Sequence, residues 1–282
     1  MRSSGMGQHP HQTRARPTTG GWSPIRAAPK LPMYQRAHPL YDRYFLRFFN
    51  ELAEQTDFAV VDVGANVGDT AVAIASVADG KPTIISVEGS PHFLPYLRRN
   101  TERWVNVQVV DAFVAPGVGG SFGYDSDRST GRLVELDGEA DGVDRWTAVA
   151  ALLDRCTASL VVWKTDTDGH DASILLENFD AIFGRCDVVW TEWDPVSFGT
   201  DPDTFSALAA RLGELGREIV IFDNFGHRML RTHGPTSATL LGHLNEWLLL
   251  QRTAGEPRVY YLDVWVLGTD LADRLWRTAG TG

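Results

Sequence analysis

The residues best suited to chemistry lie in an acidic turn with two glycines, which follows a valine-rich apolar run at 58–63. Its candidate ligand-binding residues are Asp62, Gly64, Ala65, Asn66, Gly68, Asp69 and Thr70. Glycine lets the backbone turn tightly and approach a ligand, and a helix is expected to begin directly after the turn. A nicotinamide dinucleotide fingerprint would need glycine at 64, 66 and 69, so the asparagine and aspartate at the last two positions count against it.

Acidic residues beside this turn favour a cationic ligand by electrostatic attraction, and the sulfonium and ammonium groups of S-adenosylmethionine are such cations. Glu88 ends the next strand-like run, where a carboxylate can accept both hydroxyls of a ribose, and Ser90 follows it. Asp111 ends the third run, where it could receive an adenine amino group or be solvated. We therefore expect S-adenosylmethionine to bind at these strand ends.

A second group of polar residues follows the fourth strand-like run and consists of Lys164, Asp166, Asp168 and His170. Methyl transfer is an in-line displacement, so catalysis requires that the nucleophilic oxygen be held near the methyl group and lose its proton. Asp166 or His170 could be that base, with Lys164 beside them in the catalytic group. Alternatively, Asp166 caps the following helix, His170 is solvated and Lys164 pairs with a neighbouring carboxylate.

Acceptor-binding candidates follow the fifth run, where Glu192, Trp193 and Asp194 join Asp168. Carboxylates that hold sugar hydroxyls by hydrogen bonds, without a metal, are the favoured interpretation. As an alternative, Mg²⁺ could bind Asp166, Glu192 and Asp194, orient the acceptor hydroxyl and lower its pKa. Trp190 or Trp193 could offer a stacking face, although buried tryptophan is more common. The segment 222–227 is predicted to be a turn that lines the acceptor pocket.

The elements that must position these residues alternate between strands and helices. Strands are predicted at 58–63, 83–87, 105–110, 160–163, 187–190, 218–222 and 258–267, and helices at 34–55, 70–78, 93–102, 148–153, 172–183, 205–215 and 236–251. This order predicts a doubly wound, mostly parallel seven-stranded α/β sheet with helices on both faces, which is a Rossmann-like fold. The last strand is expected to be antiparallel at or near an edge, and 121–144 to be a loop or hairpin insertion.

Length and composition limit the classes of protein that fit. The chain has 282 residues, enough for one large core, and a formal net charge of -10, which disfavours binding to nucleic-acid phosphates. Small-molecule or glycan acceptors fit this charge better. Cys156 and Cys186 precede apolar runs and are expected to be buried thiols in a reducing compartment. No run of about 18 apolar residues predicts a membrane span. Without an apolar secretory signal, a cytoplasmic location is expected.

The first part of the chain differs in composition from the rest. Residues 1–33 are basic and rich in Pro, Gly, Ser, Thr and His, with too little apolar content to offset the entropy lost on ordering. They are predicted to be a disordered tail, with a basic arm that touches an acidic partner as the alternative. Residues 34–282 are predicted to form a single methyltransferase domain.

Three segments together resemble the FkbM family of S-adenosylmethionine-dependent methyltransferases: Val61 to Thr70, Val87 to Pro91 and Lys164 to Asp171. Asp168 and Asp171 stand where that family usually has glutamate, and threonines replace two apolar residues. The resemblance implies a class I methyltransferase fold and O-methylation of a hydroxyl on a carbohydrate, glycolipid or polyketide-type acceptor. The alternatives are a NAD-dependent oxidoreductase and a catalytically silent binding protein with a cofactor-binding fold.

Overall fold

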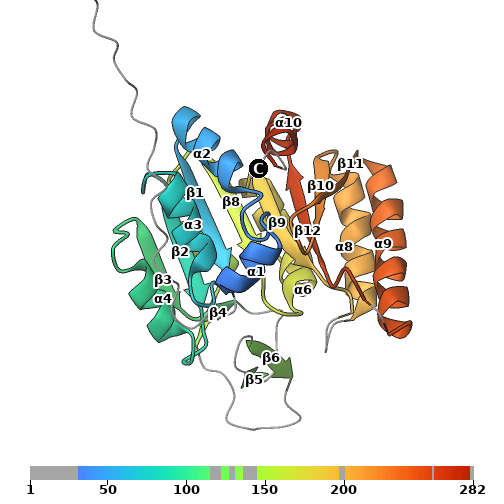
Figure 1. Cartoon of the computed structure of the whole chain (residues 1–282), viewed down its shortest axis with the longest axis horizontal. Coiled ribbons are helices and arrows are strands. Elements are labelled where there is room, and N and C mark those ends of the chain that lie inside the picture. Colours follow the sequence, from blue (N-terminus) through green and yellow to red (C-terminus); the bar gives the residue numbers. More distant parts are fainter. Residues whose placement is uncertain are drawn as a thin grey trace, which may run out of the picture.

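The computed structural model describes residues 31–114, 122–126, 131–135, 145–196, 201–255 and 257–279. Most of the predicted tail, up to residue 30, lies outside these residues, whereas residues 31–33 begin the short helix α1 (Leu31–Ala37). The described residues form an α/β fold in which one large sheet is covered by helices on both faces, as predicted (Figure 1). Among them, no helix is long and apolar enough to cross a membrane.

Five parallel strands form one side of the sheet. In spatial order they are β3 (Val107–Asp111), β2 (Thr83–Glu88), β1 (Phe58–Val63), β8 (Leu160–Thr165) and β9 (Val188–Trp193). Every residue of β1 is buried, because helices cover both faces of this central strand. Since the strands are parallel, their carboxyl ends meet at one edge of the sheet, and the residues that follow them are brought together there.

The other side of the sheet contains antiparallel pairs. β12 (Leu262–Leu267) lies between β9 and β10 (Glu218–Asp223) and is antiparallel to both, and β11 (Arg228–His233) is the edge strand. The last strand is therefore antiparallel, as predicted, but lies third from the edge.

The predicted number of seven strands is wrong, because the main sheet has eight strands among the described residues. The additional strand is β11, whose polar, partly exposed residues give no clear apolar alternation. The turn predicted at 222–227 leads directly into it and joins it to β10 in an antiparallel pair.

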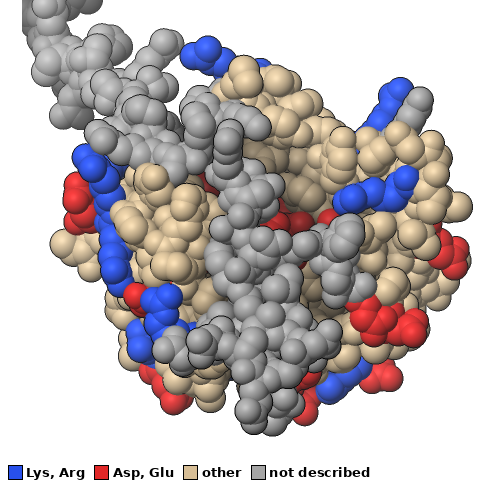
Figure 2. Space-filling model, turned by 90° about the horizontal axis from the view of Figure 1, so that it is seen from below, with Lys and Arg blue, Asp and Glu red and all other residues tan. Residues whose placement is uncertain are grey.

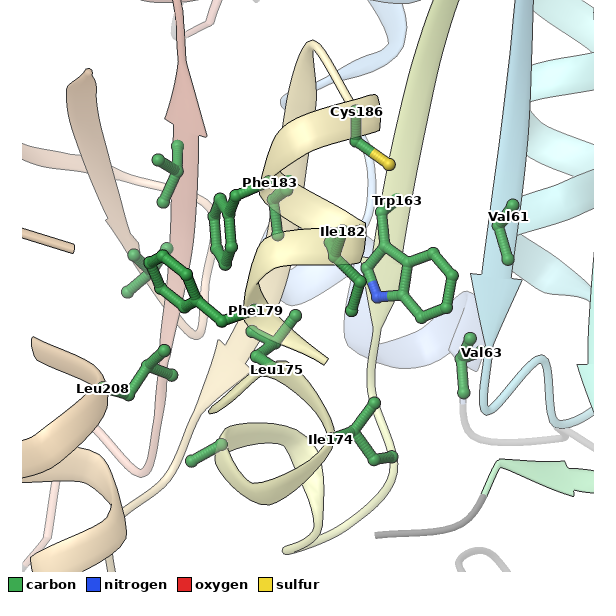
Figure 3. Packing of buried hydrophobic residues seen from close by; sticks show 14 of the residues in the cluster. Val61, Val63, Trp163, Ile174, Leu175, Phe179, Ile182, Phe183, Cys186 and Leu208 are labelled. Carbon is green, nitrogen blue, oxygen red and sulfur yellow. The ribbon is translucent and has the colours of Figure 1, made fainter. Parts of the chain in front are cut away.

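Two apolar cores lie on opposite faces of the sheet. One packs against α2 (Leu46–Gln55), α3 (Asp69–Val77) and α10 (Thr269–Thr278). The other packs against α5 (Val149–Leu153), α6 (Asp171–Glu177), α7 (Phe179–Arg185), α8 (Pro202–Glu214) and α9 (Pro235–Thr253). Figure 3 shows the indole of Trp163 in this second core, between Val61 and Val63 on one side and Ile182 on the other. Helix α4 (Leu94–Thr101) contacts α3 and β3.

The prediction of a single helix at 34–55 is wrong for its middle part, because α1 ends at Ala37 and α2 begins at Leu46. Pro39 has no backbone N–H to donate, and Asp42 has a left-handed φ of 52°, so the helix cannot continue through these residues. The aromatic stripe of α2 is core packing, as predicted. The connecting turns reach the sheet, where the Trp265 indole nitrogen donates a hydrogen bond to the Tyr44 hydroxyl at 2.8 Å.

The predicted insertion contains a hairpin. Strands β5 (Phe122–Ser126) and β6 (Gly131–Glu135) pair antiparallel, and the rest of 121–144 lies outside the described residues. A short parallel pair, β4 (Phe113–Val114) and β7 (Trp146–Thr147), flanks the insertion. Cys156 and Cys186 are both free and buried, as predicted.

We expect Tyr44→Phe to lower the free energy of unfolding by about 1–3 kcal/mol, because it leaves the fully buried indole N–H of Trp265 without its acceptor. Chemical denaturation followed by fluorescence measures this change. The control is Tyr260→Phe, since Tyr260 is 44% exposed and should tolerate loss of its hydroxyl. Equal free energies of unfolding in the two variants would show that this buried hydrogen bond does not stabilise the fold.

Candidate active site

The acidic turn after β1 is held against two neighbouring strands. The amides of Gly64 and Ala65 both donate to the Val87 carbonyl of β2 at 3.0 Å, and the Asp166 amide donates to the Val63 carbonyl at 3.0 Å. Gly64 has a φ of 78°, and a Cβ atom there would lie only 1.8 Å from the Asp166 carbonyl oxygen. Glycine is therefore required at this position by both conformation and space.

The rest of the turn leads into α3. Asn66 and Gly68 also have left-handed backbones, and Ala65 is buried. Asp69 and Thr70 form the first turn of α3 and are partly exposed. Burial raises the pKa of Asp69, an effect that the charge of Lys164 opposes.

Glu88 connects the turn to β2. Its two carboxylate oxygens accept hydrogen bonds from the amides of Asn66 at 2.8 Å and Ser90 at 2.7 Å. Burial raises its pKa to about 7 although these hydrogen bonds act in the opposite direction. Each carboxylate oxygen has two lone pairs, so Glu88 can still accept from a ligand. The buried Ser90 holds the following turn instead, because its hydroxyl accepts from the amides of His92 and Phe93.

A cavity lies beside Glu88 at the carboxyl ends of β1, β2 and β8. Its lining residues are Gly64, Asn66, Glu88 and Gly89 from the ends of β1 and β2, the apolar residues Val63, Val87, Phe93, Ala112, Phe113, Val114 and Ile174, and Asp166, Thr167, Asp168 and His170 from the segment after β8. The turn after β1 and the segment after β8 therefore face the same cavity. Sequence reasoning missed Phe93 and Phe113, which are aromatic residues close behind the ends of β2 and β3.

Asp111 is partly exposed at the end of β3, where it forms ion pairs. It pairs in register with Glu88 across β2 and β3, but it does not line the cavity. Its carboxylate forms ion pairs with Arg98, at 3.1 Å, and with Arg145, which also donates to the Gly89 carbonyl at 3.0 Å. Asp111 thereby holds the strand ends next to the cavity.

Lys164 lies between two carboxylates at the centre of the sheet. Its ammonium nitrogen is 3.1 Å from Asp62 Oδ1 and 3.1 Å from Asp166 Oδ2, and its side chain is only 4% exposed. Burial alone would lower its pKa, but the charges of Asp166, Asp62 and Asp69 outweigh burial and raise the pKa well above its usual value. Lys164 therefore stays charged, which agrees with the alternative that it pairs with a neighbouring carboxylate.

Asp166 and Glu192 form a hydrogen-bonded pair of carboxyl groups whose pKa values shift in opposite directions. Burial and the charge of Asp166 raise the pKa of Glu192 well above its usual value. For Asp166, burial is outweighed by the charge of Lys164 and by hydrogen bonds from Glu192 and Lys164, so its pKa is lowered. Glu192 therefore holds its proton more strongly than Asp166 does, and it donates the hydrogen bond between the two carboxyl groups.

The segment after Asp166 turns sharply into α6. Asp168 and Gly169 have φ values of 54° and 121°, and the buried carboxylate of Asp171 accepts from the amides of Thr167 at 2.9 Å and Gly169 at 3.4 Å. Asp171 thus holds the turn before α6. His170 is partly exposed at the cavity, and it makes no side-chain capping hydrogen bond to α6.

The remaining acceptor candidates are engaged elsewhere. Trp193 is fully buried, donates to the Asn245 carbonyl oxygen at 2.6 Å and packs edge-on against Phe205, so it offers no face to an acceptor. Asp194 accepts from the Val196 amide at 3.0 Å and lies 3.6 Å from Arg252.

The structure does not support the Mg²⁺ alternative. Among the described residues, no three carboxylate, imidazole or thiol side chains are arranged to hold a metal ion. Lys164 and Glu192 occupy the carboxylate of Asp166, and Asp194 is engaged with Arg252 and a backbone amide.

Comparison with known proteins gave structural likenesses only. No protein-family model matches the chain and no curated protein matches it, so the FkbM resemblance stays a prediction. A putative O-methyltransferase from Klebsiella pneumoniae has a TM-score of 0.44 at 8% identity, covering 88% of this chain and 92% of that one. A precorrin-6y C5,15-methyltransferase from Geobacter metallireducens has a TM-score of 0.40 at 15% identity, covering 79% and 86%.

A third similar structure is the plantazolicin methyltransferase BpumL in complex with SAH, with a TM-score of 0.39 at 10% identity, covering 84% of this chain and 88% of that one. At such low identities and TM-scores, these likenesses do not carry a function over to this chain.

We expect Gly64→Ala to lower the free energy of unfolding by about 2–5 kcal/mol, because the new methyl group would meet the Asp166 carbonyl and the residue would keep a left-handed backbone. Chemical denaturation measures the change. The control is Gly242→Ala in α9, where a Cβ atom meets nothing within 4 Å and alanine should stabilise the helix slightly. Similar stability of both variants would contradict the close approach at Gly64.

Proposed function

We propose that this chain is an S-adenosylmethionine-dependent methyltransferase that binds its cofactor in the cavity beside Glu88. The observation that carries this proposal is that the turn after β1, the carboxylate at the end of β2 and the titratable segment after β8 all line one cavity. When bound, S-adenosylmethionine supplies an electrophilic methyl group on a cationic sulfur.

The residues of the cavity fit the parts of that cofactor. Glu88 has lone pairs left to accept the ribose hydroxyls, and the side chains of Phe93 and Phe113 can pack against an adenine ring. Asp62 is fully buried, and its Oδ2 atom has no hydrogen-bond partner among the described residues. Together with Asp69 it gives the end of β1 the negative charge that a cation requires.

We infer O-methylation of a hydroxyl on a carbohydrate, glycolipid or polyketide-type acceptor, on the strength of the motifs that resemble the FkbM family. In this proposal Asp166, ionised and held by Lys164, orients the acceptor hydroxyl. His170, which lines the same cavity, can take up the proton of that hydroxyl, and Asp168 contacts the acceptor. The buried position of Trp193 argues against the contact predicted for it.

We expect Glu88→Ala to weaken S-adenosylmethionine binding by about 1.5–3 kcal/mol, or roughly 10- to 150-fold, because charged hydrogen bonds to the ribose are lost. Isothermal titration calorimetry measures the affinity. Glu54→Ala is the control, since Glu54 is exposed on α2 and does not line the cavity. Unchanged affinity in Glu88→Ala would remove Glu88 from the cofactor site, and an equal loss in both variants would indicate general damage to the fold.

We expect Asp166→Asn to keep S-adenosylmethionine affinity within a few-fold and to reduce turnover by about 10², because a neutral amide no longer orients the acceptor hydroxyl. Transfer of a labelled methyl group to an acceptor found in a glycan and polyketide panel measures turnover. Asp180→Asn on the exposed surface of α7 is the control. Full turnover in Asp166→Asn would exclude its role in catalysis.

A further inference from the structure

The two sides of the cavity differ in chemistry. The strand order is β8, β1, β2, β3, so the segments that follow β8 and β3 reach the cavity from opposite sides. The segment after β8 contributes titratable and hydroxyl side chains, whereas the segment after β3 contributes Ala112, Phe113 and Val114. Phe93, from the turn after β2, adds a second aromatic ring. The β3 side of the cavity is therefore suited to a flat, apolar group.

The surface of this edge has a matching distribution of charge. Figure 2 shows the edge where the parallel strands end, with acidic atoms recessed at the centre of the face. Uncharged residues cover much of its left side, where Figure 1 places β2, β3 and α4. The charged part of the site therefore lies away from β3.

The hydrogen-bond acceptors at the ends of β2 and β3 already have arginine donors. Asp111 pairs with Arg98 and Arg145 and does not line the cavity. Arg145 also donates to the Gly89 carbonyl at 3.0 Å. The amino group of an adenine needs an acceptor of this kind, and here both groups are bound by the protein itself.

The backbone donors after β3 are engaged as well. The Ala112 amide donates to the Val110 carbonyl at 3.1 Å, and the Phe113 amide donates to the Arg145 carbonyl at 2.8 Å. A ring nitrogen of a purine needs such an N–H donor. On this side of the cavity, the described residues thus offer a base apolar surfaces to pack against, while their polar groups bond to one another.

Phe113 lies directly against the backbone of Gly89. A Cβ atom at position 89 would be only 2.2 Å from Cδ2 and 2.3 Å from Cε2 of the Phe113 ring. Trp146 pairs with Phe113 between β7 and β4, and the centres of the two rings are 6.0 Å apart. The ring can occupy its place at the cavity because residue 89 has no side chain.

Packing on the face of a base and hydrogen bonding to its edge lead to different selectivity. Adenine presents an amino donor and a ring-nitrogen acceptor on one edge, and hypoxanthine presents a carbonyl acceptor and an N–H donor there. A site that bonds to this edge rejects the exchanged pattern, because its own polar groups are left unpaired. An aromatic ring packed on the face tolerates the exchange, because every base has a π-face.

We propose that the chain holds the purine of its cofactor by packing against Phe113 and Phe93, with Gly89 setting the position of the Phe113 ring, and that it does not select adenine by its hydrogen-bonding edge. The inference rests on the methyltransferase function proposed above and defines the cofactor specificity of that site. Glu88 holds the ribose, which is the same in adenosine and inosine, so a cofactor that carries hypoxanthine binds nearly as well as one that carries adenine.

The test compares S-adenosylhomocysteine with S-inosylhomocysteine, which differ only in the purine, by isothermal titration calorimetry on the full chain. We expect the two dissociation constants to agree within about fivefold, because a larger difference is what an unpaired hydrogen-bonding group produces.

Two variants test the packing itself. Phe113→Ala should weaken both ligands by a similar factor of about 5 to 150, the usual loss when an aromatic ring under a base is removed. Gly89→Ala should also weaken both, because the new methyl group displaces the ring. The matched controls are Tyr260→Ala, at an exposed residue that does not line the cavity, and Gly242→Ala, where a Cβ atom meets nothing within 4 Å. Neither control should change either affinity.

A preference of more than about fivefold for either ligand would overturn the inference and leave the methyltransferase proposal intact. Unchanged affinities in Phe113→Ala, or a loss for one ligand alone, would overturn it too. Wild-type affinities in Gly89→Ala would contradict the role of Gly89, and if that variant does not fold, Phe113→Ala decides the packing. Failure of S-adenosylhomocysteine to bind the wild-type chain would remove the proposed function, and this inference with it.

Discussion

The two parts of the candidate site, the turn after β1 and the segment after β8, depend on the ion pairs of the Lys164 ammonium group with Asp62 and Asp166. This ammonium group is buried and lies 3.1 Å from carboxylate oxygens of Asp62, in β1, and of Asp166, after β8. Removing one partner of such a pair leaves a buried charge without compensation, at a typical cost of about 3–5 kcal/mol. Because Asp62 belongs to β1 and Asp166 follows the neighbouring strand β8, the ammonium group of Lys164 joins the two strand ends beside the cavity.

The backbone joins the same strand ends a second time. The Asp166 amide donates to the Val63 carbonyl, and the carbonyl of Asp166 occupies the space that a side chain at position 64 would need. On the other side of the turn, Glu88 holds the Asn66 amide. Three neighbouring strands thus set the walls of the cavity before a ligand arrives, which reduces the ordering cost of binding.

The sequence predicts best where a local pattern reports a buried environment. The valine-rich run at 58–63 correctly predicted the central strand β1, and Gly64, Asn66, Glu88, Asp166, Asp168 and His170 among the predicted site residues line one cavity. Prediction from the sequence fails where contacts between residues far apart in the chain determine the structure. The partly exposed edge strand β11 has no apolar alternation, and the arginine partners of Asp111 come from α4 and from the segment before β7. The sequence shows Asp263 only as an acidic residue inside an apolar strand. Its alignment with Glu192 depends on the register between β12 and β9, which the sequence does not reveal.

The pKa values of Asp166 and Glu192 shift in opposite directions, and this bears on the role that we propose for Asp166. An ionised Asp166 already accepts from Lys164 and Glu192, and a carboxylate with a lowered pKa is a weak base. It is better suited to hold a hydroxyl than to remove its proton. His170 lines the same cavity and takes that proton in the reaction that we propose. Within the proposed methyl transfer, the surroundings of Asp166 therefore favour His170 as the base and Asp166 as the group that orients the acceptor.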